Sequence, residues 1–447
     1  MVMKQASVIE LAHDVLIPQL NRERDAQIVF DAWAKGDHVK AYKPREASTE
    51  YEGLREKAIT PLIGLVIRIL AQSIEMRDYI PGIESTKDDL MDVWRRNAMG
   101  MRQKRLYRAV FRGGVAYSTL LPGDPVPVSK IYSAKNALAV YQDPEADHWP
   151  EFGIIRETAS NKKSHFLVID GDAVYRIEGG HDGEDLKYIE EQAHDVGLPP
   201  IVRFTGEMDD EGSAEGEVER LIPIQGSIDQ AKFDLLMTQT FASWKIRVLT
   251  GMQKPGTQEE AQQQKLVLER DRLLILEGEQ SKAFTLDGTD LEGYIKAGTA
   301  SKQDLASVAQ IAQKAIVGSQ SNTSDGAEAQ AAEEWSTQRK IKDYEESFAA
   351  SWGQWFRLAG LEQGIANAWD DYAGVCDWRD STIRSMSQMA DALGKIASQL
   401  GVPKQELWDL IPDISPDQVR RWKEVLANDP YRQMLEGLGD DDPFADG

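Results

Sequence analysis

Cysteine is nearly absent from this sequence: the 447-residue chain contains one, Cys376. A single thiol cannot form a disulfide within the chain and cannot by itself hold a metal ion. This composition excludes a small disulfide-stabilised secreted protein and favours a reducing cytosol, or a particle assembled there. The length exceeds what one hydrophobic core usually serves, so we expect two or three domains.

Long apolar runs are also missing. The longest, residues 59–74, is interrupted by Arg68 and is short for a membrane span. The first residues lack the basic stretch, apolar run and small-residue cleavage site of a signal peptide. We therefore expect a core helix at 59–74 and no membrane partner.

The common catalytic motifs are absent. The sequence has no G-x-x-x-x-G-K-[ST], no G-x-G-x-x-G between a strand and a helix, no H-E-x-x-H and no G-x-S-x-G. Its six histidines are scattered without the spacing of metal ligands. The sequence therefore predicts a protein that is not an enzyme and that needs no cofactor and no metal.

Positive charge is in deficit, with 51 basic residues against 74 acidic ones and a formal net charge of −23. A chain this acidic repels nucleic acid phosphates and anionic membranes, so it does not capture them non-specifically. Any nucleic acid partner must therefore be guided rather than held by electrostatic attraction.

One group of carboxylates leaves a different function open. Paired carboxylates can hold Mg²⁺ for phosphodiester cleavage. Because a glycine-containing loop carries them, a solvated loop is the favoured interpretation and a metal-dependent DNA-processing enzyme is the alternative. The four residues are Asp209, Asp210, Glu211 and Glu215.

The apolar pattern predicts an α+β protein with a mixed sheet. Helical periodicity covers residues 1–35, 59–74 and 88–111. From Gly113 the pattern changes to short alternating runs separated by turn residues, with a hairpin at Asp170-Gly171. The runs are 112–124, 137–142, 152–159, 165–179 and 198–204.

A long helix with little apolar surface follows the acidic loop. Its apolar residues recur at spacings of four, three and four, which gives a narrow stripe on one face. Such a helix carries too little apolar surface to be buried in its own domain, so we expect it to pack against another copy or a partner. The stripe consists of Ile224, Ile228, Ala231 and Leu235.

The second half of the chain returns to strand, then helix. Strands are predicted at 245–251, 272–278 and 375–382, and a long helix at 327–361 whose tryptophans, Trp335 included, are expected to pack in the core. The last 15 residues are acidic and rich in small residues, which is typical of disorder.

The order of these segments resembles the portal proteins of tailed bacteriophages, in particular the branch from phages of actinobacteria, related to the portal of a Bacillus siphophage. Four stretches carry the resemblance. They are LYRAVFRGGVAYSTLLPG at 106–123; LPPIVRF at 198–204 with GEVERLIPIQGSIDQAKFDLL at 216–236; SNTSDGAEAQAAEEW at 321–335; and VCDWRDST at 375–382 with MADALGKIASQLGVPKQELWDLIP at 389–412.

The resemblance implies a portal fold with a helix-rich wing, a mixed β-sheet, long stem helices, a small α/β clip and a helical C-terminal crown. The implied segments are an N-terminal arm and wing at 1–216, a first stem helix at 217–245, a clip at 246–288, a second stem helix at 289–313, a channel loop at 314–326, a long wing helix and strand at 327–382, a crown at 383–432 and an acidic tail at 433–447.

The resemblance also implies a function. About twelve copies would form a ring at one capsid vertex. Double-stranded DNA would pass through it without sequence recognition during packaging and ejection. The ring would dock the terminase large subunit, a head-completion or adaptor protein, and the major capsid and scaffold proteins, in a virion assembled in the host cytoplasm.

Specific residues follow from the same resemblance. The apolar stripe of the first stem helix would contact neighbouring subunits, while the polar faces of that helix would meet the channel and solvent. Small polar residues and scattered lysines would let DNA slide. The expected channel residues are Lys282, Lys302, Lys314, Gly318, Ser319, Ser321, Asn322 and Thr323. Besides the enzyme, a cytosolic helical adaptor without a pore remains as an alternative.

Overall fold

The structure is a computed structural model. It describes residues 2–42, 50–144, 146–158, 163–180, 182–194, 196–209, 212–242, 247–250, 273–276, 283–285, 291–318, 327–365, 367–379, 386–411, 414 and 416–428. The chain divides into two compact units. The first holds Met1–Gln72, Arg105–Leu121 and Ser129–Ser351, and the second holds Ser73–Lys104, Pro122–Val128 and Trp352–Gly447. Helices and strands occur in both, as the α+β class predicts.

A five-stranded sheet forms one layer of the first unit, in the order β4-β5-β6-β7-β8. All four neighbouring pairs run antiparallel. The predicted mixed sheet is therefore wrong here, because short turns join consecutive strands and such turns give antiparallel neighbours. The hairpin at Asp170-Gly171 is confirmed. The strands are Ala137–Val140, Phe152–Thr158, Ser164–Ile169, Ala173–Gly179 and Lys187–Ala193.

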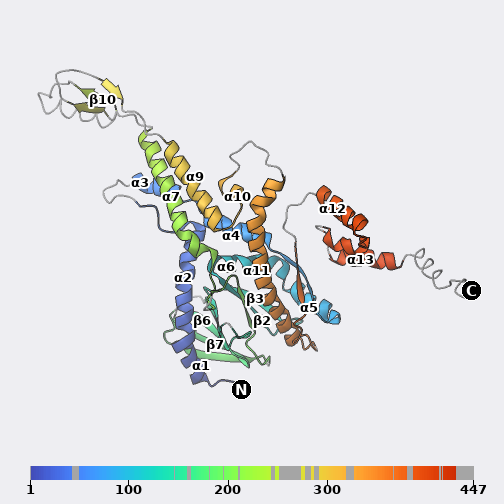
Figure 1. Ribbon diagram of the computed structural model, residues 1–447. Helices are drawn as coiled ribbons and strands as arrows, with labels where there is room; N and C mark the ends of the chain where they lie inside the picture. The colour runs from blue at the N-terminus through green and yellow to red at the C-terminus, as the bar shows by residue number, and fades with distance from the viewer. Residues whose placement is uncertain are drawn as a thin grey trace, which may run out of the picture. The chain divides into compact units, whose positions relative to one another are not determined.

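The N-terminal helices pack on this sheet. They are α1 (Gln5–Leu11), a π-helical turn (Ala12–Leu16) and α2 (Ile17–Lys35). The side chains of Leu16 and Leu20 meet Phe166 and Tyr175 in a fully buried cluster. Figure 1 shows α2 in blue beside β6 and β7.

A second sheet, in the order β3-β2-β9, adjoins long helices. Its strands are β3 (Val128–Ser133), β2 (Val115–Leu121) and β9 (Ile201–Thr205). The hydroxyls of Ser347 and Ser351 on α11 (Ala327–Glu362) donate hydrogen bonds to the backbone oxygens of Thr205 and Arg203 on β9.

Aromatic rings join α11 to α6 (Met99–Gly113) in the first unit. Tyr107 stacks on Phe348 with a centroid distance of 4.6 Å, and Phe111 meets Tyr344 edge to face at 4.7 Å. Burial of large rings in these geometries favours one fixed helix arrangement.

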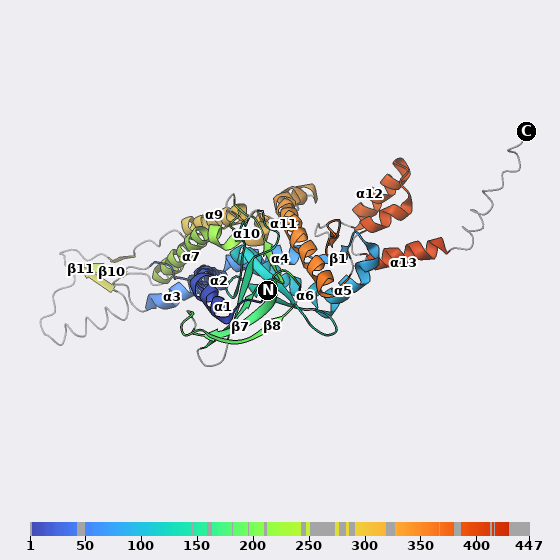
Figure 2. The ribbon, with the colours of Figure 1, turned by 90° about the horizontal axis from the view of Figure 1, so that it is seen from below.

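Two helices, α7 (Glu217–Ala242) and α9 (Glu292–Val308), lie side by side in both views (Figure 1 and Figure 2). The short helices α3 (Glu50–Ala58), α4 (Leu62–Ser73) and α10 (Gln313–Val317) also lie wholly or largely in the first unit. The helix predicted for the first stem thus begins at residue 217, and the predicted channel loop begins within α10.

Between α7 and α9 the chain forms a small sheet in the order β11-β10-β12. β10 (Arg247–Thr250) pairs parallel with β11 (Leu273–Leu276) and antiparallel with β12 (Ala283–Thr285). Strands were predicted at the first two positions. Most of the predicted clip, including Lys282, lies outside the described residues.

The second unit is built around tryptophans. Trp94 on α5 (Lys87–Arg96) meets Trp352 edge to face with a centroid distance of 4.8 Å, and Tyr79 on β1 (Met76–Ile80) stacks on Phe356 at 4.0 Å. β1 pairs antiparallel with β13 (Val375–Trp378). This unit also contains 3₁₀ turns at Glu84–Thr86 and Lys404–Leu410, and the helices α12 (Met386–Gln399) and α13 (Pro416–Ala427).

Two helix predictions need correction. The single helix expected over 88–111 is two helices, because α5 ends at Arg96 and Ala98 adopts a left-handed φ of 51° before α6. Trp352 and Trp355 are fully buried as predicted, but Trp335 is 63% exposed.

Among the described residues, no helix is both long and apolar enough to cross a membrane.

Candidate functional site: the paired helices α7 and α9

The α7 helix begins with acidic side chains and contains a proline. Glu217 and Glu219 lie in its first turn, where carboxylates favour the helix dipole. Pro223 lies inside the helix, where it removes one backbone donor. The apolar stripe is narrow, so the position of α7 depends on what its polar side chains contact.

Polar residues of α7 are buried within the chain, which corrects the expectation that they face solvent or a channel. Gln225 is 0% exposed and Asp229 is 2% exposed. Gln225 accepts a hydrogen bond from the Leu62 backbone N–H at 3.1 Å and donates one to the Thr60 carbonyl oxygen at 2.7 Å. The Gln225 side chain thus supplies hydrogen-bond partners that the backbone of the α3–α4 connection would otherwise lack.

Asp229 extends the same contact. Its carboxylate accepts the Thr60 backbone N–H at 3.0 Å, and its other oxygen lies 2.7 Å from His38 Nε2. The His38 ring stacks on Trp33 with a centroid distance of 3.9 Å. A buried carboxylate is tolerated when it is hydrogen-bonded in this way. Asp229 therefore fastens α7 to the segment after α2 and to the start of α4.

A second buried group fastens both helices to α11. Lys340 Nζ lies 2.6 Å from Glu217 Oε1, with side-chain exposures of 2% and 0%, and also donates to the Ala309 carbonyl oxygen at 3.0 Å. The Tyr344 hydroxyl donates to Glu217 Oε1 at 2.8 Å. Burial, together with the neighbouring Glu217 carboxylate, raises the pKa of Tyr344. The start of α7 and the end of α9 are thus held at one point.

The corner after α9 is held by Thr337. Its hydroxyl donates to the Gln310 carbonyl oxygen at 2.9 Å and accepts the Ala312 backbone N–H at 3.2 Å. Gln310 has a left-handed φ of 55°, which a non-glycine residue adopts only when its surroundings require it. These contacts fix the chain just before the predicted channel loop.

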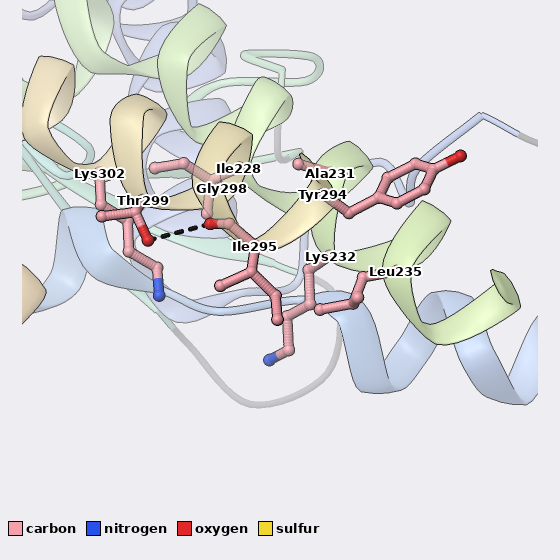
Figure 3. A pocket seen from close by; sticks show the side chains of 9 residues that line it. All are labelled: Ile228, Ala231, Lys232, Leu235, Tyr294, Ile295, Gly298, Thr299 and Lys302. Carbon is pink, nitrogen blue, oxygen red and sulfur yellow. Dashed lines mark hydrogen bonds between the residues drawn. The ribbon is translucent and has the colours of Figure 1, made fainter. Parts of the chain in front are cut away.

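An open pocket of about 300 Å³ lies between α7 and α9 (Figure 3). Three of the four stripe residues line it. In Figure 3 the side chains of Lys232, Lys302 and Ile295 extend toward the same side of the pocket. The Thr299 hydroxyl donates a hydrogen bond to the Ile295 carbonyl oxygen at 2.9 Å. The lining consists of Ile228, Ala231, Lys232, Leu235, Tyr294, Ile295, Gly298, Thr299 and Lys302.

The stripe is already partly used within one chain. Ile228 is 2% exposed, whereas Ala231 and Leu235 are partly buried against α9. Ile224 is partly buried and does not line the pocket. On α9, Ile295 is 52% exposed and Tyr294 is 37% exposed. Apolar surface therefore remains open on this face.

The predicted channel residues are distributed over two places. Lys302 lies at the pocket with the stripe, while Lys314 and Gly318 belong to the α10 region. Gly318 follows α10 with a φ of 80°, a conformation that suits glycine. The remaining predicted channel residues lie outside the described residues: Lys282, Ser319, Ser321, Asn322 and Thr323.

The described carboxylates of the acidic loop contact groups that are close in the sequence. Asp209 Oδ1 accepts the Ser213 backbone N–H at 2.7 Å, and Glu215 lies 3.5 Å from Arg220. Asp210 and Glu211 lie outside the described residues. Within the described part of the chain, no three His, Cys, Asp or Glu side chains are grouped as metal ligands. Asp209 thus serves to close a turn.

These observations define an α+β protein with two paired helices, α7 and α9, which buried polar contacts hold at one end. The segment that connects the two helices in the sequence contains a small sheet. The chain belongs to the phage portal protein family, SPP1 Gp6-like, which it matches over residues 13–429. No curated protein matches it.

Solved structures of related description were also found, at low similarity. The neck of an empty GTA particle computed with C6 symmetry contains a chain 14% identical, with a TM-score of 0.42, covering 85% of this chain and 97% of that one. The neck of a native GTA particle computed with C12 symmetry contains a chain that is 13% identical, with a TM-score of 0.43; the match covers 89% of this chain and 98% of that one. An HK97 family phage portal protein from Corynebacterium diphtheriae is 10% identical, with a TM-score of 0.31; the match covers 85% of this chain and 95% of that one. The family match alone carries the assignment.

Proposed function

We propose that this protein forms a ring of about twelve copies at one capsid vertex and is the conduit for double-stranded DNA during packaging and ejection. The observation that carries the proposal is the family match over residues 13–429. In this proposal the chain belongs to the actinobacteriophage branch of the family, and the protein is part of the virion, assembled in the host cytoplasm.

The paired helices support a stem role. Glu217, Asp229 and Lys340 fasten α7 and α9 to the rest of the first unit, so the two helices can transmit force without a large apolar core of their own. The apolar surface left open at Leu235 and Ile295 suits contact with a neighbouring copy.

The charge supports a sliding conduit. Each phosphate neutralised by a fixed cation adds affinity through counterion release, and that affinity must be broken at every step of translocation. A net charge of −23 with few lysines near the path keeps this affinity low. The proposed channel residues are Lys282, Lys302, Lys314, Gly318, Ser319, Ser321, Asn322 and Thr323.

The segment between α7 and α9 is proposed as the clip that docks the terminase large subunit and later a head-completion or adaptor protein. The described strands β10, β11 and β12 lie within it. Major capsid and scaffold proteins are proposed as partners of the body of the ring. In this role the protein is not an enzyme and uses no cofactor.

Localisation on the particle tests the proposal. Gold-labelled antibody against this chain, applied to purified tail-less heads, should mark one vertex per head. Heads from phage that lack the gene serve as the control and should carry no label. Gold spread over the capsid surface, or gold absent from heads that contain DNA, would overturn the proposal.

A further inference from the structure

Two exposed apolar side chains lie on the short segment between α2 and α3. Val39 is 83% exposed and Tyr42 is 74% exposed. The segment is held against α7 on both sides of Val39, because His38 Nε2 lies 2.7 Å from Asp229 and the Tyr42 backbone N–H donates to Gln230 Oε1 at 2.8 Å. Both apolar groups are therefore presented on a fixed backbone.

The segment and the α7–α9 pocket lie at the same level of α7 but on different faces. An α-helix turns by about 100° per residue, so Gln230, which holds Tyr42, lies about 200° around the helix from Ile228 in the pocket. Ala41 packs beside Phe233 on the segment's side of the helix. One face of α7 thus presents an apolar projection and the other an apolar recess.

The two faces also differ in charge. Lys232 and Lys302 lie at the pocket, and the Lys232 ammonium also donates to the Thr60 hydroxyl at 2.7 Å. Near the projection, Lys40 and Glu56 pair at 2.7 Å and offset each other's charge, so the exposed Asp37 supplies the negative charge of this face. Opposite charges around an apolar centre favour one docking register over others.

A projection on one face and a recess on the other are what a head-to-tail contact requires, because such an interface joins two different patches and generates a ring when the rotation between copies closes. We propose that Val39 and Tyr42 of one copy insert into the α7–α9 pocket of the next copy, against Leu235 and Ile295. This inference rests on the proposed ring and names the residues that close it.

Cysteine cross-linking tests the contact. The variants are Val39→Cys, Ile295→Cys and the double variant, each treated with oxidant and with a short bis-maleimide. The double variant should give a ladder of covalent oligomers, and a mixture of the two single variants should give dimers only. Each single variant alone should remain monomeric on a denaturing gel, as should the wild type, whose one cysteine, Cys376, is 7% exposed.

A second pair of variants measures the contribution to assembly. Val39→Ser with Tyr42→Ser should lower the association constant about tenfold or more, as expected when apolar anchors leave a pocket. The matched control is Val29→Ser, which removes a 49% exposed apolar side chain from α2 and should leave assembly unchanged. Thermal unfolding of both variants should match the wild type.

The outcomes separate this inference from the ring proposal. If the wild type forms rings, but the double cysteine variant gives no ladder and the serine variants assemble normally, the inference is overturned. The ring proposal then stands, with a different occupant for the pocket. Cross-linking of Val39→Cys alone would indicate a two-fold contact and would also overturn it. Absence of both rings and ladder would overturn both proposals.

Discussion

Lys340 Nζ and Glu217 Oε1 lie 2.6 Å apart with both side chains excluded from solvent, and this pair joins α11 to the first residue of α7. The same ammonium group holds the Ala309 carbonyl oxygen just after α9. One lysine therefore holds the start of α7 and the end of α9 at a single point. We infer that it sets the geometry of the α7–α9 pair.

Breaking this pair should destabilise the protein strongly. Lys340→Met leaves the Glu217 carboxylate buried without its counter-charge, and loss of one partner of a buried pair costs about 3–5 kcal/mol. The free energy of unfolding in urea measures the effect. The exposed neighbour Lys342→Met is the matched control and should change stability by less than about 0.5 kcal/mol. Equal effects of the two variants would contradict the role given to Lys340.

Gln225 should contribute to stability through the backbone groups it satisfies. Gln225→Leu leaves the Leu62 N–H and the Thr60 carbonyl without their side-chain partner, which costs about 1–3 kcal/mol for each buried group left unpaired. Urea unfolding checks this, with the exposed Gln239→Leu on the same helix as control. A stabilised Gln225→Leu would show that α7 prefers an apolar contact there.

Glu362 should make stability fall as pH rises. Burial raises the pKa of Glu362 to about 7 from its ordinary value of 4.5. The folded state therefore holds a proton that the unfolded state has released between these values, so stability decreases from pH 4.5 to 7. Glu362→Gln should remove this part of the pH dependence and should be more stable than the wild type at pH 8. The exposed Glu346→Gln should keep the wild-type profile.

DNA should not be cut. The Asp209 carboxylate accepts the Ser213 N–H and Glu215 lies beside Arg220, so we expect purified protein with Mg²⁺ to leave linear double-stranded DNA intact. Incubation followed by gel electrophoresis measures this, with the Asp209→Ala, Glu215→Ala double variant alongside. Cleavage by the wild type that the double variant loses would restore the enzyme hypothesis.

Periodicity predicted the elements whose apolar residues repeat regularly. The core helix predicted at 59–74 is α4, with Ile63, Val66 and Leu70 buried, and the hairpin between β6 and β7 lies where Asp170-Gly171 placed it. The strand β8 was not predicted, because its sequence, KYIEEQA, belongs to an exposed edge with polar residues on both faces. An edge strand of this kind leaves no apolar alternation to detect.

The candidate site was predictable only in part. The spacing of Ile228, Ala231 and Leu235 identified an apolar face of α7, but the sequence predicted its contact with another copy or a partner, whereas in the structure this face meets α9 of the same chain. The burial of Gln225 and Asp229 could not be read from the same pattern, because their partners are backbone groups near Thr60, about 165 residues away, and periodicity carries no information on distant hydrogen bonds. The same holds for Lys340, whose partner Glu217 is far away in the sequence.

The native mass of the purified protein, with negative-stain images of the same sample, tests the ring most directly. The account predicts a particle of about twelve times the 50.0 kDa chain with a central hole. A monodisperse monomer or compact dimer without a hole, unchanged when capsid and scaffold proteins are added, would contradict it.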